Sequence, residues 1–147
     1  MDTETLFLIT QATIAIIAFS SVILATITIK SNKNLNQKML FNEIVKQERA
    51  LRIKLLEYRE KINNPDLNNE QSKIAKLDYD TLLFNYYEFF GVCIYKKLIN
   101  EKETKLLFKE YVKSVKEIFD NSILFKEEYA EKSQYKVLQW LFREWGI

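Results

Sequence analysis

The chain has 147 residues and a formal net charge of +2, from 22 Lys and Arg against 20 Asp and Glu. This balance does not indicate a nucleic-acid surface, and we predict no direct nucleic-acid binding. The sequence contains no histidine, which excludes His-based acid–base catalysis, triads that use His and the usual Cys/His zinc sites. The one cysteine cannot form a disulfide within the chain, and a protein without disulfides is typical of a reducing compartment. With two Gly and one Pro, the composition favours helices over short strands.

Residues 6–29 (LFLITQATIAIIAFSSVILATITI) contain no charge, no Gly and no Pro. As a helix they would extend about 36 Å, enough to cross a hydrocarbon core of roughly 30 Å. One alternative is a cleaved signal peptide, which would begin with a basic region and have a shorter apolar core, whereas this chain begins MDTET. The other alternative is a buried helix of a soluble domain. We predict a retained transmembrane helix over 6–29, embedded in the lipid bilayer.

The flanking charges predict the orientation of this span. No Lys or Arg precedes it, whereas Lys30, Lys33, Lys38 and Lys46 follow. Because positive charge stays on the cytoplasmic side, residues 1–5 are predicted to be extracytoplasmic and the rest cytosolic. The prediction is a single-pass signal anchor in the inner (cytoplasmic) membrane. A polar juxtamembrane link over 30–34 would lead to a cytosolic helical domain over 35–147, a small bundle of about four helices in an all-α protein.

Small and polar residues form a stripe along one side of the predicted span. Such residues let helices approach closely in lipid and exchange hydrogen bonds, and a glutamine there is costly unless it has a partner. The alternative is that the hydroxyls bond back to carbonyls of their own helix. We predict a homo-oligomer in which the stripe faces neighbouring copies or the lumen of a pore. Its members are Gln11, Ala15, Ala18, Ser21, Ala25 and Thr28.

Apolar spacing predicts the helices of the domain. The first covers 35–62 and ends before Pro65, because a proline and its neighbours disfavour helix. A second begins at Asn69, with a break near 78–80, and continues as a central helix with a buried stripe: Leu83, Tyr87, Phe90 and Ile94. Asn100 is predicted to cap a third helix over 101–119, which would bury Leu106, Leu107, Tyr111, Val115 and Ile118. The last, over 133–145, would bury Tyr135, Leu138, Leu141, Phe142 and Trp145.

Asn85 and Glu88 lie three residues apart in the central helix and therefore share a face. A buried carboxylate is costly unless it is paired, so we expect Arg52 or Arg59 of the first helix to meet Glu88. This group would be a buried polar pin that fixes the register of the helices. The alternative is a proton-active or metal-binding carboxylate. Because no second acid or His lies at the spacing of a metal motif in this helix, we favour the pin and predict no catalytic residue, no metal and no cofactor.

Two segments carry a resemblance to known proteins: LLFNYYEFFGVCIYKKLINEKETKLLFKEYV and the closing YKVLQWLFREW. After an N-terminal apolar helix, they resemble a bacterial family of uncharacterised single-span membrane proteins with a small helical domain of unknown function. Residues 83–88 (LFNYYE) match its Leu-Asn-aromatic-aromatic-Glu pattern with one inserted aromatic. More distantly, the layout is similar to the membrane pore accessory protein of type VI-B CRISPR systems, which implies a pore or scaffold in antiviral defence. The arginine–histidine nuclease motif associated with that family cannot be carried over, since the chain has no histidine.

These observations predict a non-enzymatic, single-pass membrane protein that self-associates through its span and its helical domain. In the sharper form of this hypothesis, several copies form a membrane pore in antiviral or stress defence. The first alternative is a membrane tether whose helical domain recruits a cytosolic protein partner. The second is a His-free, metal-dependent membrane enzyme, which would have to use Glu88, Asp78 or Asp80.

Overall fold

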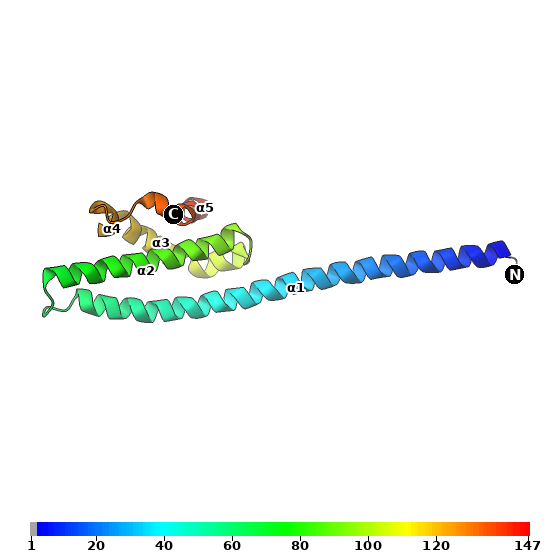
Figure 1. Ribbon diagram of the computed structural model, residues 1–147, viewed down its shortest axis with the longest axis horizontal. Helices are drawn as coiled ribbons and strands as arrows, with labels where there is room; N and C mark the ends of the chain where they lie inside the picture. The colour runs from blue at the N-terminus through cyan, green and yellow to red at the C-terminus, as the bar shows by residue number, and fades with distance from the viewer. Residues whose placement is uncertain (1–2) are drawn as a thin grey trace. The chain divides into compact units, whose positions relative to one another are not determined.

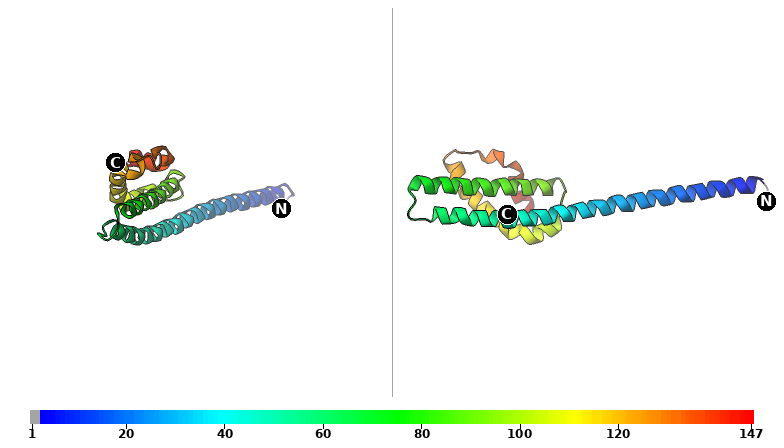
Figure 2. Two further views of the ribbon diagram at one scale, coloured as in Figure 1. Left: turned by 60° about the vertical axis from the view of Figure 1, so that its left-hand side comes forward. Right: turned by 60° about the horizontal axis from the view of Figure 1, so that its bottom comes forward.

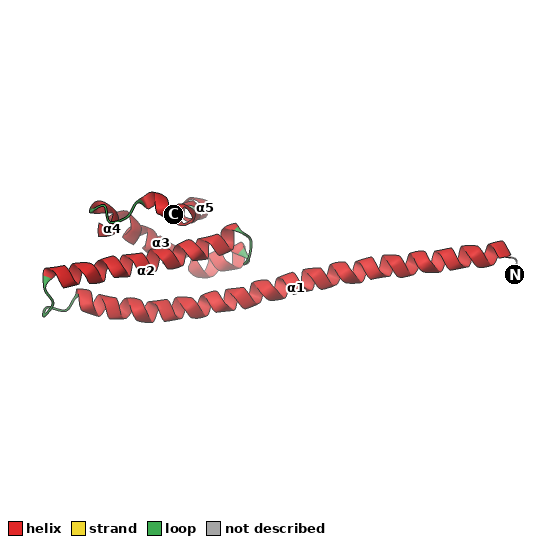
Figure 3. Cartoon of the chain, in the orientation of Figure 1, coloured by secondary structure: helices red, strands yellow, loops and turns green. Residues whose placement is uncertain are grey.

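The computed structural model describes the backbone of residues 3–147 and the side chains of residues 23–147. The regular structure in this part of the chain is entirely helical, which confirms the predicted all-α class (Figures 1 and 3). The elements in chain order are α1 (Thr3–Ile62), α2 (Asn69–Tyr95), α3 (Glu101–Asn121), α4 (Ile123–Lys126), the 3₁₀ turn η1 (Lys132–Gln134) and α5 (Lys136–Trp145). The chain divides into two compact units, Met1–Met39 and Leu40–Ile147.

The first unit consists of the N-terminal part of α1. Its backbone is helical across 30–34, where a link is predicted, because nothing there breaks a helix: the segment has neither Gly nor Pro. Within the described end of the predicted span, four large apolar side chains are between 44% and 70% exposed: Ile23, Leu24, Ile27 and Ile29. Most side chains of the predicted span, including those of Gln11, Ala15, Ala18 and Ser21, lie outside the described residues.

None of the helices, as far as their residues are described, combines the length and the hydropathy needed to cross a membrane.

The core of the second unit is built around α2. This helix runs alongside the 40–62 part of α1, and α3, α4 and α5 also pack against it (Figure 2). The predicted central stripe is confirmed, because Leu83, Tyr87, Phe90 and Ile94 are all buried. On α1, Ile44 and Leu51 complete this core. α2 is central because it is apolar around most of its girth.

The helix ends follow local signals in the sequence. α1 ends at Ile62, before Pro65, as predicted. Asn68 then forms a capping box with Gln71 at the start of α2. Asn100 caps α3, as predicted, by accepting hydrogen bonds from the backbone nitrogens of Lys102 and Glu103. These side chains satisfy backbone donors that the first turn of a helix leaves unpaired.

The buried face of α3 differs from the predicted one. Of the predicted set only Val115 is buried; Ile118 is half-buried, and Leu106, Leu107 and Tyr111 are exposed. The observed buried residues are Thr104, Phe108, Val112, Val115 and Phe119. Thr104 can be buried because its hydroxyl donates to the Asn100 carbonyl at 2.6 Å. The apolar residues of α3 form two stripes on different faces of the helix. The stripe that packs against α2 is not the stripe predicted to be buried.

Two further predictions are corrected in part. α2 continues through 78–80, where a break is predicted. The Asp80 carboxylate does not cap the start of a helix, as that prediction assumed, but accepts a hydrogen bond from the Ser122 hydroxyl. The last helix begins at Lys136, after η1, rather than at 133. The five residues predicted to be buried there are buried, so the face of α5 is confirmed. The short helix α4 is not predicted from the sequence.

Candidate functional site

An open groove of about 330 Å³ lies between the 48–59 part of α1, the middle of α2 and the C-terminal half of α3. This volume is at the lower end of the range of about 300–1,000 Å³ for small-molecule sites. The polar residues of its lining are Glu48, Arg52, Arg59 and Ser114. The remaining residues are apolar or aromatic: Leu51, Leu55, Leu56, Tyr79, Leu83, Tyr87, Tyr111, Val115 and Ile118. The groove is therefore an apolar surface with charges at particular places.

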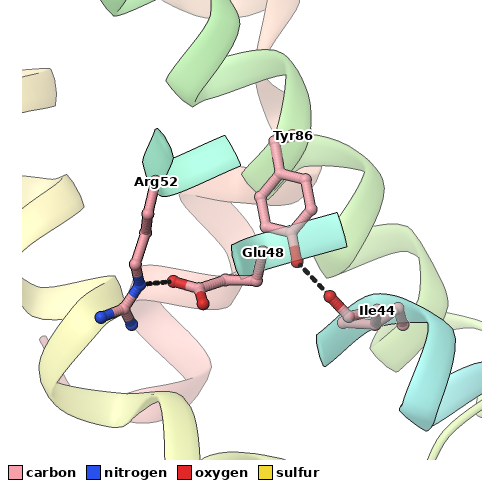
Figure 4. Close-up of polar contacts among 4 residues, drawn as sticks. All are labelled: Ile44, Glu48, Arg52 and Tyr86. Atoms are coloured by element: carbon pink, nitrogen blue, oxygen red, sulfur yellow. Dashed lines mark hydrogen bonds and ion pairs between the residues drawn. The ribbon is translucent and has the colours of Figure 1, made fainter. Parts of the chain in front are cut away.

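A fixed ion pair forms one part of the groove. Glu48 is only 7% exposed, and its carboxylate accepts a hydrogen bond from Nε of Arg52, one turn later on α1 (Figure 4). The Arg52 guanidinium carbon lies 3.9 Å from the centre of the Tyr111 ring of α3, which is cation–π geometry. The contact with Tyr111 and then the pairing with Glu48 raise the pKa of Arg52 above its ordinary value. Arg52 is therefore held between two helices and stays charged.

Two tyrosines of α2, Tyr86 and Tyr87, lie near this ion pair. The Tyr86 hydroxyl donates to the carbonyl of Ile44 on α1 at 3.0 Å, so it ties α2 to α1 (Figure 4). Burial raises the pKa of Tyr86 and of Tyr87, and the nearby Glu48 carboxylate raises both further. Both phenols are therefore neutral at physiological pH.

Arg59 lies two turns after Arg52 on the same side of α1 and is exposed. The positions three and four residues from it on the chain hold Leu55, Leu56, Ile62 and Asn63, so no carboxylate occupies an ion-pairing position on the helix. Within residues 23–147, no ion pair includes Arg59. It is the one lining cation that is not neutralised by the protein.

The structure does not bring together the four residues of the predicted polar pin. Asn85 is exposed, and Glu88 is joined to neither arginine by an ion pair among the described side chains. Glu88 instead accepts hydrogen bonds from the backbone nitrogens of Val137 at 3.1 Å and Leu138 at 2.6 Å. Two of the unpaired amides at the start of α5 thus take the place of the expected arginine. Glu88 does join two helices, but they are α2 and α5.

The three carboxylates named for the alternative enzymatic site have different surroundings. Asp78 is exposed, Glu88 is bonded to α5, and Asp80 is buried against Ser122. Burial raises the pKa of Asp80, and the hydrogen bond from Ser122 opposes that shift. Among the residues that the structure describes, no three His, Cys, Asp or Glu side chains are grouped so that they could hold a metal ion.

Part of the groove's lining was not predicted from the sequence, for identifiable reasons. Arg52 and Arg59 are among the predicted site residues, but Glu48 and Tyr111 are not. The spacing of Glu48 and Arg52, four residues apart, is a signal that could have found the ion pair. Tyr111 could not be found in this way, because it belongs to the face of α3 that is assigned wrongly.

A family model described as a domain of unknown function (DUF4760) matches residues 15–145. The chain belongs to the DUF4760 family. This agrees with the resemblance to an uncharacterised family, and it adds no link to CRISPR systems or to a membrane family. The matched region contains the groove and all of α2 to α5, together with the second half of the apolar stretch 6–29. Neither the search of curated proteins nor that of solved structures yields a match.

Proposed function

We propose that this DUF4760 chain is a non-enzymatic, single-pass membrane protein, with residues 6–29 in the inner membrane and the helical domain in the cytosol. The observation that carries the proposal is the absence of charge over 6–29, followed at once by lysines. The part of this stretch with described side chains supports it, because Ile23, Leu24, Ile27 and Ile29 are exposed and would contact lipid tails. The helical backbone over Thr3–Ile62 also satisfies its own hydrogen bonds, as a membrane requires.

Extraction of membranes with alkaline carbonate tests the anchor. We expect the full chain to stay in the membrane pellet, and a protease added to spheroplasts to leave a C-terminal tag intact. The double variant Ile16→Lys/Ile17→Lys should be released, since each lysine near the centre of a span costs about 2.5–3.5 kcal/mol. The matched control is Ile53→Lys, which adds a lysine at an exposed position of the same helix outside the span. Release of the unchanged chain would overturn the proposal.

Self-association through the span is the second component of the proposed function. Ala25 and Thr28 are the members of the predicted stripe with described side chains, and both are exposed. The Thr28 hydroxyl donates to the Leu24 carbonyl of its own helix at 2.9 Å, so it needs no neighbouring copy. The case therefore rests on Gln11, whose amide finds no partner in lipid tails. In the sharper form, several copies would form a pore that acts in antiviral or stress defence.

Cross-linking in nanodiscs and dye release from liposomes separate these possibilities. We expect oligomers whose yield falls in Gln11→Leu and is unchanged in Thr13→Val, a polar position on the opposite side of the span. A strictly monomeric chain would refute self-association. Oligomers that release no dye would refute the pore and leave a scaffold.

A tether that recruits a cytosolic protein is the second candidate function. The observation that favours it is the pair Leu106 and Leu107 near the start of α3, which are 86% and 60% exposed. In this proposal the two leucines belong to an apolar patch, and exposed apolar patches are typical of protein contacts. In this case Leu106→Lys/Leu107→Lys should abolish co-purification of cytosolic protein with the chain, without changing its membrane fraction or its oligomers.

A further inference from the structure

We propose that the groove between α1, α2 and α3 binds a small amphipathic carboxylate, with its charged end at Arg59 and its apolar body against Leu55 and Ile118. This inference goes beyond the proposed function, because neither the anchor nor self-association requires a ligand.

The shape and lining of the groove set the size and polarity of the ligand. Its volume of about 330 Å³ corresponds to roughly ten non-hydrogen atoms, on the scale of about 30 Å³ per water in the liquid. Nine of the thirteen lining residues are apolar or aromatic, so the part of the ligand inside must be apolar as well. The Ser114 hydroxyl already donates to the carbonyl of Glu110 at 3.2 Å. Recognition of a charged end of the ligand therefore falls to the arginines.

The charges of the lining favour a ligand that carries a single negative charge. Glu48 contributes one negative charge, and Arg52 and Arg59 contribute two positive charges. Glu48 is already bound to Arg52, so one guanidinium charge, that of Arg59, is left over. Glu57, Glu60 and Lys61 line a neighbouring open hollow that Arg59 also borders, and none of them forms an ion pair with it in the described part of the chain.

The chemistry of Arg59 favours a carboxylate. A guanidinium is a planar fork that pairs with the two oxygens of a carboxylate at once. Arg52 fixes the other end of the site, because Glu48 and Tyr111 hold it in place and so keep the wall of the groove in one position. A ligand with an apolar body and one carboxylate satisfies both the lining and the charge.

Photolabelling of the full chain in nanodiscs of neutral phosphatidylcholine tests this proposal. The probe is para-azidobenzoate, an aryl carboxylate of suitable size, and the matched neutral probe is para-azidobenzamide. Labelled residues are mapped by peptide mass spectrometry. We expect labels on the 51–59 part of α1 and the 111–118 part of α3, with a half-saturating concentration about tenfold lower for the benzoate.

Two arginine variants separate recognition by Arg59 from a general effect of positive charge. Arg59→Gln should remove the tenfold preference for the benzoate. Arg49→Gln, at an exposed arginine of the same helix that does not line the groove, should leave it unchanged. Ser114→Trp, which fills the groove from its exposed edge, should remove the labels altogether. Equal labelling by the two probes, labels away from the residues that line the groove, or an unchanged preference in Arg59→Gln would each overturn the proposal. Tryptophan fluorescence before labelling verifies that the arginine variants are folded.

Discussion

Replacing Glu88 by alanine would test how α5 is held against α2. The change removes two hydrogen bonds to a charged acceptor, at the backbone nitrogens of Val137 and Leu138. Such bonds contribute about 1.5–3 kcal/mol each, and the lower value applies here because Glu88 is half-buried and water can replace part of each bond. The free energy of unfolding should therefore fall by about 3 kcal/mol in Glu88→Ala. Glu88→Gln keeps one acceptor oxygen, so its loss should be about 1.5 kcal/mol.

The chain provides its own reporter for this experiment. Its two tryptophans, Trp140 and Trp145, both belong to α5, so the emission maximum of the full chain in urea follows the release of this helix. Glu110→Ala, at an exposed glutamate of α3, is the matched control and should change stability by no more than about 0.5 kcal/mol. If Glu88→Ala unfolds at the same urea concentration as the unchanged chain, the amides of α5 do not depend on Glu88 and the reasoning is refuted.

Three further predictions concern single buried groups. Because burial raises the pKa of Asp80, the folded state binds the proton of this carboxyl more tightly than the unfolded state does. The contribution of Asp80 to the free energy of unfolding therefore falls as the pH rises above about 4. The stability of the unchanged chain minus that of Asp80→Asn should therefore grow as the pH is lowered from 7 to 4.5 in urea titrations; a shrinking difference would contradict this. The Trp145 indole nitrogen is buried with no hydrogen-bond partner among the described residues, so replacing the indole by another ring loses no hydrogen bond. In thermal melts, Trp145→Phe should lower the free energy of unfolding by less than about 1.5 kcal/mol, whereas Trp145→Ala, which leaves a cavity, should lower it by about 3–5 kcal/mol. Cys93 is buried and its pKa is raised, so a thiol reagent should label it only as fast as the domain unfolds, and rapid labelling without urea would show that α2 opens locally.

The helices with one dominant apolar stripe could be predicted from the sequence. Leu138, Leu141 and Trp145 recur at helical spacing in α5, and a helix of this kind has only one way to face a core. α3 has two candidate stripes, and the sequence offers no local reason to bury Thr104 in preference to Leu107. That choice depends on the shape of α2, which is a property of the assembled core.

Of the residues that line the groove, only Arg52 and Arg59 are among the site residues predicted from the sequence. A charge such as Glu88 in an apolar helix signals that a partner exists, and it does not say whether that partner is a side chain or the start of another helix. The groove depends on three helices meeting at side chains such as Leu55, Tyr87 and Ile118, so no window of the sequence contains it. α4 has only four residues, which is too short for the sequence to show the periodic spacing of apolar residues that indicates a helix.

Ser122 ends α3 and begins α4 with no loop residue between them. Its hydroxyl oxygen accepts from the backbone nitrogen of Leu124 at 3.1 Å while the hydroxyl donates to Asp80, so both its conformation and its position are fixed. This junction therefore has no room for added sequence, whereas the exposed connection at 63–66 has its backbone in contact with solvent. A fluorescent protein or an epitope intended to follow this chain in cells belongs between α1 and α2.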